Sequence, residues 1–246
     1  MHVVILGTES PLGTAIAQAF SDHDVVGYET GQYDDIDLRG ASIYIHAPKA
    51  DRMFAYSADP YDDRSNIDRT LIDAKIAGLA AWHRPKRVVY LSSKAAYTDS
   101  FRGLTFRVGE ESFKRNSKVT ILRMFDLTTD LGALKSMRQS VNFKEINCPF
   151  PPDLPLDMLA PEDAAKAVRL VTDAFRTPGL TADIGSGVLM TAEQYANEFL
   201  SANNLDKSVN FASRKKSYGP QRAADVGIMN RAGVLVTPLR EVLGSE

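Results

Sequence analysis

Short apolar runs alternate with helical patterns along the first half of the chain. His2–Leu6 is a β-branched apolar run that ends at Gly7, and the apolar positions after it recur at helical spacing. Further strands are expected at Asp24–Tyr28, Ala41–His46, Arg87–Leu91 and Lys118–Met124, with helices at Asn66–Trp82 and Leu104–Lys114. Apolar strands that alternate with helices are typical of a parallel sheet covered on both faces. The pattern therefore predicts an α/β fold with a doubly wound parallel sheet.

The pattern weakens in the second half of the chain. From Leu131 to Leu159 the periodicity is lost and prolines stand at 149, 151, 152 and 155, which predicts an irregular segment or lid. A helix at Pro161–Phe175, a strand at Thr181–Gly185, a helix at Thr191–Ala202 and a last helical stretch after Pro238 are then expected. We expect residues 1–130 to form the core domain, to which 161–175 and 181–185 return, while 131–160 and 186–246 form a smaller region.

Composition excludes several classes of protein. With Lys and Arg numbering 29 against 31 Asp and Glu, the net charge of −2 provides no field that recruits nucleic acid or an anionic membrane. The N-terminus lacks a basic segment, so no secretory signal is expected, and no apolar run approaches the ~20 residues of a membrane span. The single Cys148 and the scattered histidines suit neither a disulfide nor a metal site. We expect a cytoplasmic protein without a bound metal.

The strongest motif is the glycine-rich turn that follows the first strand and opens the first helix. Such a turn directs the first helical amides at a pyrophosphate, which predicts dinucleotide binding; a turn that holds no ligand is the alternative. Ser10 takes the place of a middle glycine, where its side chain is expected to crowd the phosphates. The expected contacts are Gly7, Thr8, Ser10, Pro11, Leu12 and Gly13.

Glu29 ends the second predicted strand, where an acidic residue determines the type of dinucleotide. A carboxylate there accepts from both ribose hydroxyls and repels a 2′-phosphate, which favours NAD over NADP. The alternative is a solvated loop glutamate.

Several short motifs, in this order and spacing, carry a resemblance to a known family. They are the turn from Gly7 to Gly13, Asp37-Leu38, IHAPKA, NIDRT from Asn66, VVYLSSKAAY, LRMF, PEDAAKAV, ADIGSG and RAAD…TPLREVLG. The chain resembles the extended short-chain dehydrogenase/reductase superfamily, the NAD-dependent epimerases and dehydratases. The resemblance implies a Rossmann-type fold, NAD as cofactor, a nucleotide sugar as substrate, and a small C-terminal substrate-binding region formed by 131–160 and 186–246. It also implies a homodimer that packs the helices at Asn66–Trp82 and Leu104–Lys114 against their symmetry mates.

The resemblance also implies site residues beyond the turn. Further cofactor contacts are expected at Asp37, Leu38, Ala47, Pro48, Lys49, Asn66, Ser92 and Phe125, and substrate contacts at Ser93, Asp126 and Arg222. Ser93 matches the catalytic Ser/Thr of the family, although both serines could instead cap a strand end. For Lys49 and Arg222 a solvated basic side chain is the alternative.

The chain departs from the family at its catalytic pair. Phe106 and Glu110 stand where the family carries Tyr-x-x-x-Lys, its proton donor and the cation that lowers the tyrosine pKa. Tyr90 and Lys94 have the same spacing, but Tyr90 lies in a predicted strand, so we interpret it as core and Lys94 as a loop residue. Replacing both Phe106 by Tyr and Glu110 by Lys is expected to be the smallest change that restores the pair.

Three functions therefore remain open. The chain is an enzyme with an altered acid/base set, in which a substrate group, water, Lys49 or Asp126 supplies the proton. Alternatively it is a catalytically silent relative that serves as an NAD(H) or nucleotide-sugar sensor, scaffold or partner subunit, or a relative that acts through protein contacts without a dinucleotide.

Overall fold

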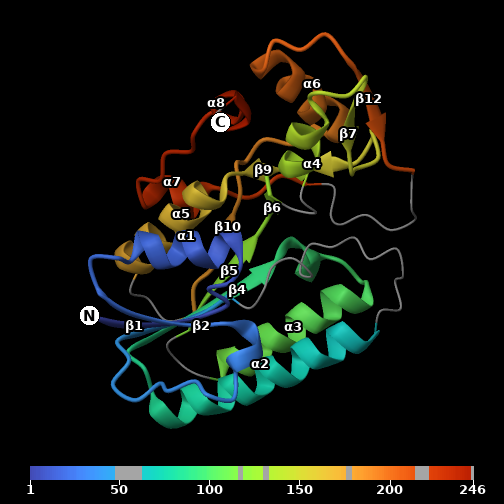
Figure 1. Cartoon of the computed structure of the whole chain (residues 1–246). Coiled ribbons are helices and arrows are strands. Elements are labelled where there is room, and N and C mark those ends of the chain that lie inside the picture. Colours follow the sequence, from blue (N-terminus) through green and yellow to red (C-terminus); the bar gives the residue numbers. More distant parts are fainter. Residues whose placement is uncertain (48–62, 116–118, 130–132, 176–178, 214–221, 245–246) are drawn as a thin grey trace.

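A six-stranded parallel sheet forms the centre of the molecule. The computed structural model describes residues 1–47, 63–115, 119–129, 133–175, 179–213 and 222–244 (Figure 1). The strands are β1 (His2–Leu6), β2 (Asp24–Tyr28), β3 (Ile43–His46), β4 (Arg87–Ser93), β5 (Val119–Met124) and β10 (Thr181–Ile184). Their spatial order is β10-β5-β4-β3-β1-β2, and all neighbours run parallel. The predicted doubly wound sheet is confirmed.

Helices cover both faces of the sheet. On one face α1 (Pro11–Ala19) packs against α5 (Pro161–Ala174), and on the other α2 (Asp63–His83) packs against α3 (Phe101–Lys114) (Figure 1). Side chains of β1 divide between these faces, because Val3 and Ile5 join the core beneath α1 and α5, whereas Val4 and Leu6 join the core beneath α2 and α3. Nearly continuous apolar strands are required because both faces are buried.

The strand order creates a crevice at one edge of the sheet. The chain leaves β1 for β2 on one side, and β3 then lies on the other side of β1. At such a switch point the connections after β1 and β3 leave the sheet in opposite directions, and ligands of open α/β sheets bind outside the carboxyl ends of the strands there. The glycine-rich turn follows β1 directly.

The expectation of an irregular segment from Leu131 to Leu159 is wrong. The region contains α4 (Ala133–Ser140), β7 (Glu145–Cys148), β8 (Pro155–Leu156) and β9 (Met158–Leu159). The strands pair with β12 (Ser208–Phe211), β11 (Met190–Thr191) and β6 (Asp126–Leu127), respectively. Strands of two to four residues are too short to show a periodicity in the sequence. Their apolar side chains pack with α6 (Ala192–Ala202) and α8 (Leu239–Gly244) in a third core.

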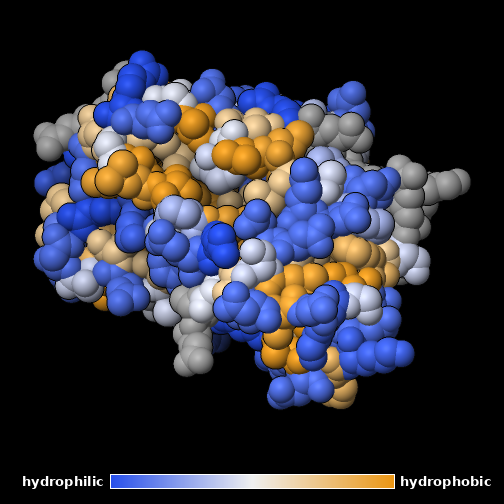
Figure 2. Space-filling model, turned by 90° about the horizontal axis from the view of Figure 1, so that it is seen from above, coloured by the Kyte–Doolittle hydropathy of each residue, from blue (hydrophilic) through white to orange (hydrophobic). Residues whose placement is uncertain are grey.

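The remaining elements are short. They are the 3₁₀ helices η1 (Thr30–Gln32) and η3 (Lys94–Tyr97) and helix α7 (Gly227–Arg231). Helix α3 begins three residues before the predicted Leu104, because Ser100 caps it by accepting a hydrogen bond from the Gly103 N–H. Within the described ranges, no helix combines the length and the apolar character that a membrane span needs. Seen from above, the surface carries separate hydrophobic areas set among hydrophilic residues (Figure 2).

Candidate functional site

The glycine-rich turn requires glycine at both of its ends. Gly7 has φ +98°, in the left-handed region that glycine favours. A Cβ on Gly13 would lie 1.9 Å from the Gly7 carbonyl oxygen, so the first turn of α1 packs on the backbone of the strand end. This is the close approach that a dinucleotide turn needs.

Ser10 points into the turn, so the expectation that its side chain crowds the phosphates is wrong. The side chain is buried, and its Oγ donates to the Gly7 carbonyl oxygen at 3.1 Å while accepting from the Gly13 N–H at 2.9 Å. The Ser10 hydroxyl thereby connects the two ends of the turn by hydrogen bonds. Because Pro11 has no N–H and that of Gly13 is engaged, Leu12 supplies the remaining amide of the first helical turn.

The turn is bound tightly to the end of β2. The N–H groups of Gly7 and Thr8 both donate to the Tyr28 carbonyl oxygen, at 2.7 and 3.2 Å. The Glu9 carboxylate accepts from the Thr30 N–H at 3.1 and 3.2 Å. Glu29 follows β2 as expected, and it is exposed. Glu9, which sequence reasoning missed, thus brings a second carboxylate to this end of the crevice.

Asp37 and Leu38, the next two expected cofactor contacts, lie in different surroundings. Asp37 forms hydrogen bonds with Arg39, whose guanidinium lowers the pKa of the Asp37 carboxyl well below its usual range. The Leu38 side chain is fully buried in the core beneath α2 and α3.

Ala47 is buried directly after β3. Pro48 and Lys49 lie outside the described residues, as does the Asn66 side chain, although Asn66 belongs to α2.

Ser92 and Ser93 end β4 at the expected place, and both are buried. Ser92 Oγ donates to Glu110 Oε1 at 2.7 Å. Ser93 Oγ caps η3 by accepting from the Ala95 N–H at 3.2 Å, so the capping alternative describes its present contact. Phe125, directly after β5, is buried.

Glu110, expected from the resemblance to stand in place of a lysine, is paired with an arginine. Glu110 is buried, and both of its oxygens accept from Arg123 on β5, at 2.8 and 2.7 Å. The pairing raises the pKa of Arg123. Phe106 is buried with the Arg69 guanidinium 5.4 Å from its ring centroid, and its side chain has no proton to exchange.

Arg222 is bound to the sheet. Its guanidinium donates to Asp183 Oδ2 at 2.8 Å and lies over the Tyr97 ring, whose other neighbour is Arg123. The Tyr97 hydroxyl donates to Asp183 Oδ1 at 2.6 Å, and burial together with this carboxylate raises the Tyr97 pKa. The side chain of Arg222 is 44% exposed, so it reaches solvent while engaged.

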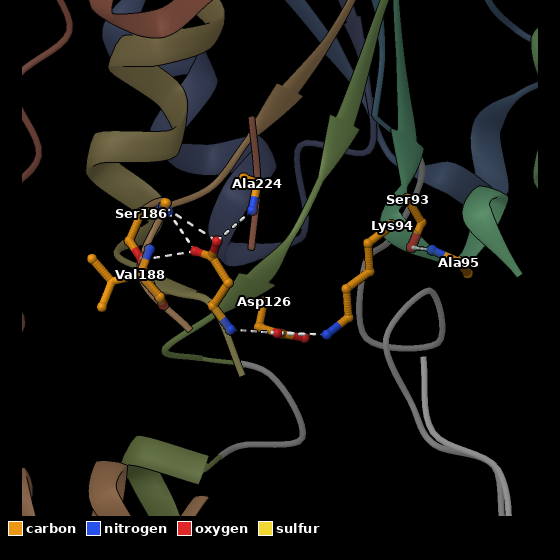
Figure 3. Close-up of polar contacts among 9 residues, drawn as sticks. Ser93, Lys94, Ala95, Asp126, Ser186, Val188 and Ala224 are labelled. Carbon is orange, nitrogen blue, oxygen red and sulfur yellow. Dashed lines mark hydrogen bonds and ion pairs between the residues drawn. The ribbon is translucent and has the colours of Figure 1, made fainter. Parts of the chain in front are cut away.

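Lys94 is a buried ion-pair partner and not the loop residue expected from the sequence. Its Nζ donates to Asp126 Oδ2 at 2.6 Å, and the side chains are 8% and 5% exposed (Figure 3). The Asp157 N–H donates to the same oxygen at 2.9 Å. Burial raises the pKa of Asp126, an effect that the Lys94 ammonium opposes. Lys94 directly follows β4 and Asp126 lies two residues beyond β5, so their contact depends on the placement of these two strands side by side in the sheet.

Asp157 connects this pair to the C-terminal region. Its carboxylate accepts from the Ser186 N–H and hydroxyl, the Gly187 N–H and the Ala224 N–H (Figure 3). Three stretches that are distant in sequence therefore meet at one buried carboxylate beside the crevice.

A second buried network lies beneath α3. Asp73 accepts from Tyr90 and Arg69 and contacts His46 Nε2, each at 2.7 Å. His46 Nδ1 lies 2.7 Å from the Tyr44 hydroxyl, and burial lowers the His46 pKa. Tyr90 is a core residue, as the sequence indicated, and His46 is buried beside it.

Sheet order and the turn at its switch point define a Rossmann-type fold. No family model and no curated protein matches the sequence. Solved structures match along their whole length. A variant of UDP-glucuronic acid 4-epimerase from Bacillus cereus, complexed with a fluorinated UDP-glucuronic acid and NAD, has a TM-score of 0.84 at 14% identity, covering 100% of this chain and 98% of that one.

Two further structures agree on the fold. The NAD-dependent NDP-hexosamine 5,6-dehydratase TunA, of tunicamycin biosynthesis, has a TM-score of 0.78 at 12% identity, covering 98% of this chain and 95% of that one. A short-chain dehydrogenase/reductase superfamily protein from Agrobacterium tumefaciens, with bound NAD, has a TM-score of 0.73 at 15% identity, covering 99% and 95%.

Proposed function

We propose that the protein binds NAD(H) across the crevice at the carboxyl edge of the sheet. The observation that carries this proposal is the turn from Gly7 to Gly13, which stands at the switch point and packs as tightly on β1 as a dinucleotide turn must. The pyrophosphate lies at the start of α1 and the adenosine ribose at the end of β2. Similar structures that carry NAD support the same cofactor.

The two carboxylates at the ribose end favour NAD(H) over NADP(H). Glu29 accepts from the ribose hydroxyls, and Glu9 lies close by because it accepts from the Thr30 N–H. A 2′-phosphate placed there would meet both negative charges.

The substrate is a nucleotide-sugar-like or other hydroxyl or carbonyl compound, bound between the sheet edge and the C-terminal region. Similar structures are named as enzymes of UDP-glucuronic acid and NDP-hexosamine, which supports this class. Arg222, Ser93 and Asp126 lie at this edge of the fold, and Arg222 reaches solvent.

The chemistry is of the epimerase/dehydratase type with an atypical acid/base set. Phe106 has no proton to exchange, and Glu110 is neutralised by Arg123. The alternative is a catalytically silent sensor, scaffold or partner subunit. It is favoured by three ion pairs, in which the charged groups at this edge bind one another: Lys94–Asp126, Arg123–Glu110 and Arg222–Asp183.

Titration calorimetry with NADH and NADPH tests the proposed cofactor. We expect NADH to bind more tightly than NADPH. Glu9→Gln is expected to reduce the ratio of the two dissociation constants by about fivefold, because it removes one charge near the 2′ position but keeps an oxygen for the Thr30 N–H. Glu198→Gln, on the exposed side of α6, is the matched control. Absence of binding by either nucleotide would refute the proposed function, and tighter binding of NADPH would refute the preference.

The homodimer implied by the resemblance is part of the proposal. Large apolar side chains are exposed on the outer faces of α2 and α3, namely Leu71, Trp82, Phe101, Leu104 and Val108. Light scattering is expected to give a dimer for the wild type and a monomer for Leu104→Lys. The control Leu170→Lys changes a similarly placed residue on α5, across the sheet. A monomeric wild type would refute this part.

A further inference from the structure

The crevice lacks the usual proton donor, and a different charged pair lies at the same edge of the sheet. Lys94 directly follows β4, and Asp126 lies two residues after the end of β5, the neighbouring strand in the middle of the sheet. Lys94 is adjacent in sequence to Ser93, which ends β4. Ligands of such sheets lie outside these strand ends.

The pair is fixed in one arrangement. Asp126 Oδ2 receives both the Lys94 ammonium and the Asp157 N–H (Figure 3). Asp157 is itself held by backbone donors of Ser186, Gly187 and Ala224, so the carboxylate that faces Lys94 has a rigid support. An ammonium carries three N–H donors, and Asp126 takes one of them.

Stability is a weak reason for such a pair. Removing two charges from water costs as much as their attraction returns, and apolar side chains of similar size often stabilise a protein equally well. The side chains are 8% and 5% exposed, so this cost applies to both. Perturbed, paired titratable groups in a cleft are common at functional sites.

Other groups at this edge are already engaged. Glu110 is held by Arg123 through two hydrogen bonds, and the Tyr97 hydroxyl donates to Asp183. His46 lies in the network beneath α3. Lys94 is also paired, with Asp126, but its ammonium carries N–H donors beyond the one that Asp126 takes.

We propose that Lys94 is the proton donor of the site, with Asp126 as its positioning residue; this rests on the proposed NAD(H) function. Bound NADH would supply the hydride that the carbonyl carbon of the substrate takes up. The carbonyl oxygen takes a proton from the Lys94 ammonium. The products are an alcohol, NAD⁺ and a neutral Lys94 amine, which regains its proton from water.

The same residue serves a carbonyl or a hydroxyl substrate. Lys94 would give a proton to the oxygen of a carbonyl that is reduced and take one from the hydroxyl of an alcohol that is oxidised, so either direction of the reaction tests its role.

Lys94→Arg separates the catalytic role from a structural one. Arginine keeps a cation opposite Asp126 but does not give up its proton in proteins. The probes are UDP-glucuronic acid and UDP-glucose with NAD⁺, and the readout is NADH absorbance at 340 nm in a single turnover. We expect Lys94→Arg and Lys94→Met to lose about 100-fold or more in rate, as for loss of an acid/base group. Lys114→Met, which removes an exposed lysine of α3, keeps the wild-type rate.

Calorimetry with NADH on each variant distinguishes the possible failures. A Lys94→Arg variant that retains the wild-type rate would show that the pair is structural and overturn the proposal. A wild type that binds NAD⁺ and both sugars but transfers no hydride would also overturn it and favour the silent alternative. A wild type that binds no NADH refutes the proposed function itself. If Lys94→Met fails to fold, Lys94→Arg still carries the test.

Discussion

At the scale of single residues, Glu110 shows how one substitution becomes fixed by its surroundings. Its carboxylate accepts from Arg123 twice and from Ser92 once. A lysine at this position would face Arg123 in a buried place and lose all three contacts. The double change Phe106→Tyr with Glu110→Lys, expected from the sequence to restore the usual pair, therefore places two cations together.

Glu110→Lys is expected to lower the free energy of unfolding by about 3–5 kcal/mol, the cost of breaking a buried ion pair. The charge swap Glu110→Lys with Arg123→Glu is expected to recover much of this loss, because the pair is re-formed in reverse. Urea denaturation of the single and double variants measures both values. Equal stability of the wild type and Glu110→Lys would contradict the inferred pairing.

At the scale of elements, α3 lies directly on the network beneath it. A Cβ on Gly109 would stand 2.2 Å from the Tyr90 hydroxyl and 2.4 Å from Asp73 Oδ2. The backbone of α3 at Gly109 therefore packs directly on the polar network, and a larger residue at this position would force α3 away from the sheet.

Gly109→Ala is expected to lower the free energy of unfolding by about 1–3 kcal/mol, the usual cost of overpacking, although alanine favours helix. The control is Gly78→Ala in α2, where no atom lies within 4 Å of the added Cβ. That variant is expected to be more stable by up to about 1 kcal/mol. Thermal or urea unfolding of the two variants compares them, and stabilisation by both would contradict the close packing.

The sequence predicted the bounds of both the buried strand β1 and the partly exposed edge strand β2. β1 and β2 have the predicted bounds, because their apolar runs stop where the polar turns begin. The strands of the C-terminal region were missed because two to four residues carry no period. Their positions depend on pairing with distant partners, which no local pattern records.

The candidate site divides in the same way. The turn at Gly7 and the substitutions at Phe106 and Glu110 could be found from local spacing. The contact between Lys94 and Asp126 could not, since it depends on the order in which β4 and β5 are placed in the sheet. The direction of the Ser10 side chain was also hidden, because a serine can cap the turn or cover it.

At the scale of the whole molecule, the network around Asp73 makes stability depend on pH. Burial lowers the His46 pKa, so below about pH 6.5 the unfolded chain takes up a proton that the folded protein does not. Asp73 adds a second loss at lower pH. Burial alone would raise the Asp73 pKa, but Arg69 and His46 outweigh it and lower that pKa, so this contribution disappears below about pH 4.

The free energy of unfolding is therefore expected to fall between pH 7.5 and 5. In His46→Gln this slope is expected to be smaller, although the variant is less stable at every pH because it disturbs the buried contact with Asp73. His83→Gln, at the end of α2, serves as the control and keeps the wild-type slope. Urea titrations across this pH range measure the effect, and an unchanged slope in His46→Gln would contradict it.

The carboxylate of Asp157 also determines how the molecule opens. The amide hydrogens of Ser186, Gly187 and Ala224 are all donated to this one group, although Ala224 is far from the other two along the chain. An amide exchanges its hydrogen for deuterium when its bond breaks, and these three share an acceptor that is itself buried. We therefore expect these three amides to lose their hydrogen bonds in one common opening. The Ala224 amide should then exchange at the same rate as those of Ser186 and Gly187, and more slowly than the amides of a fraying C-terminus.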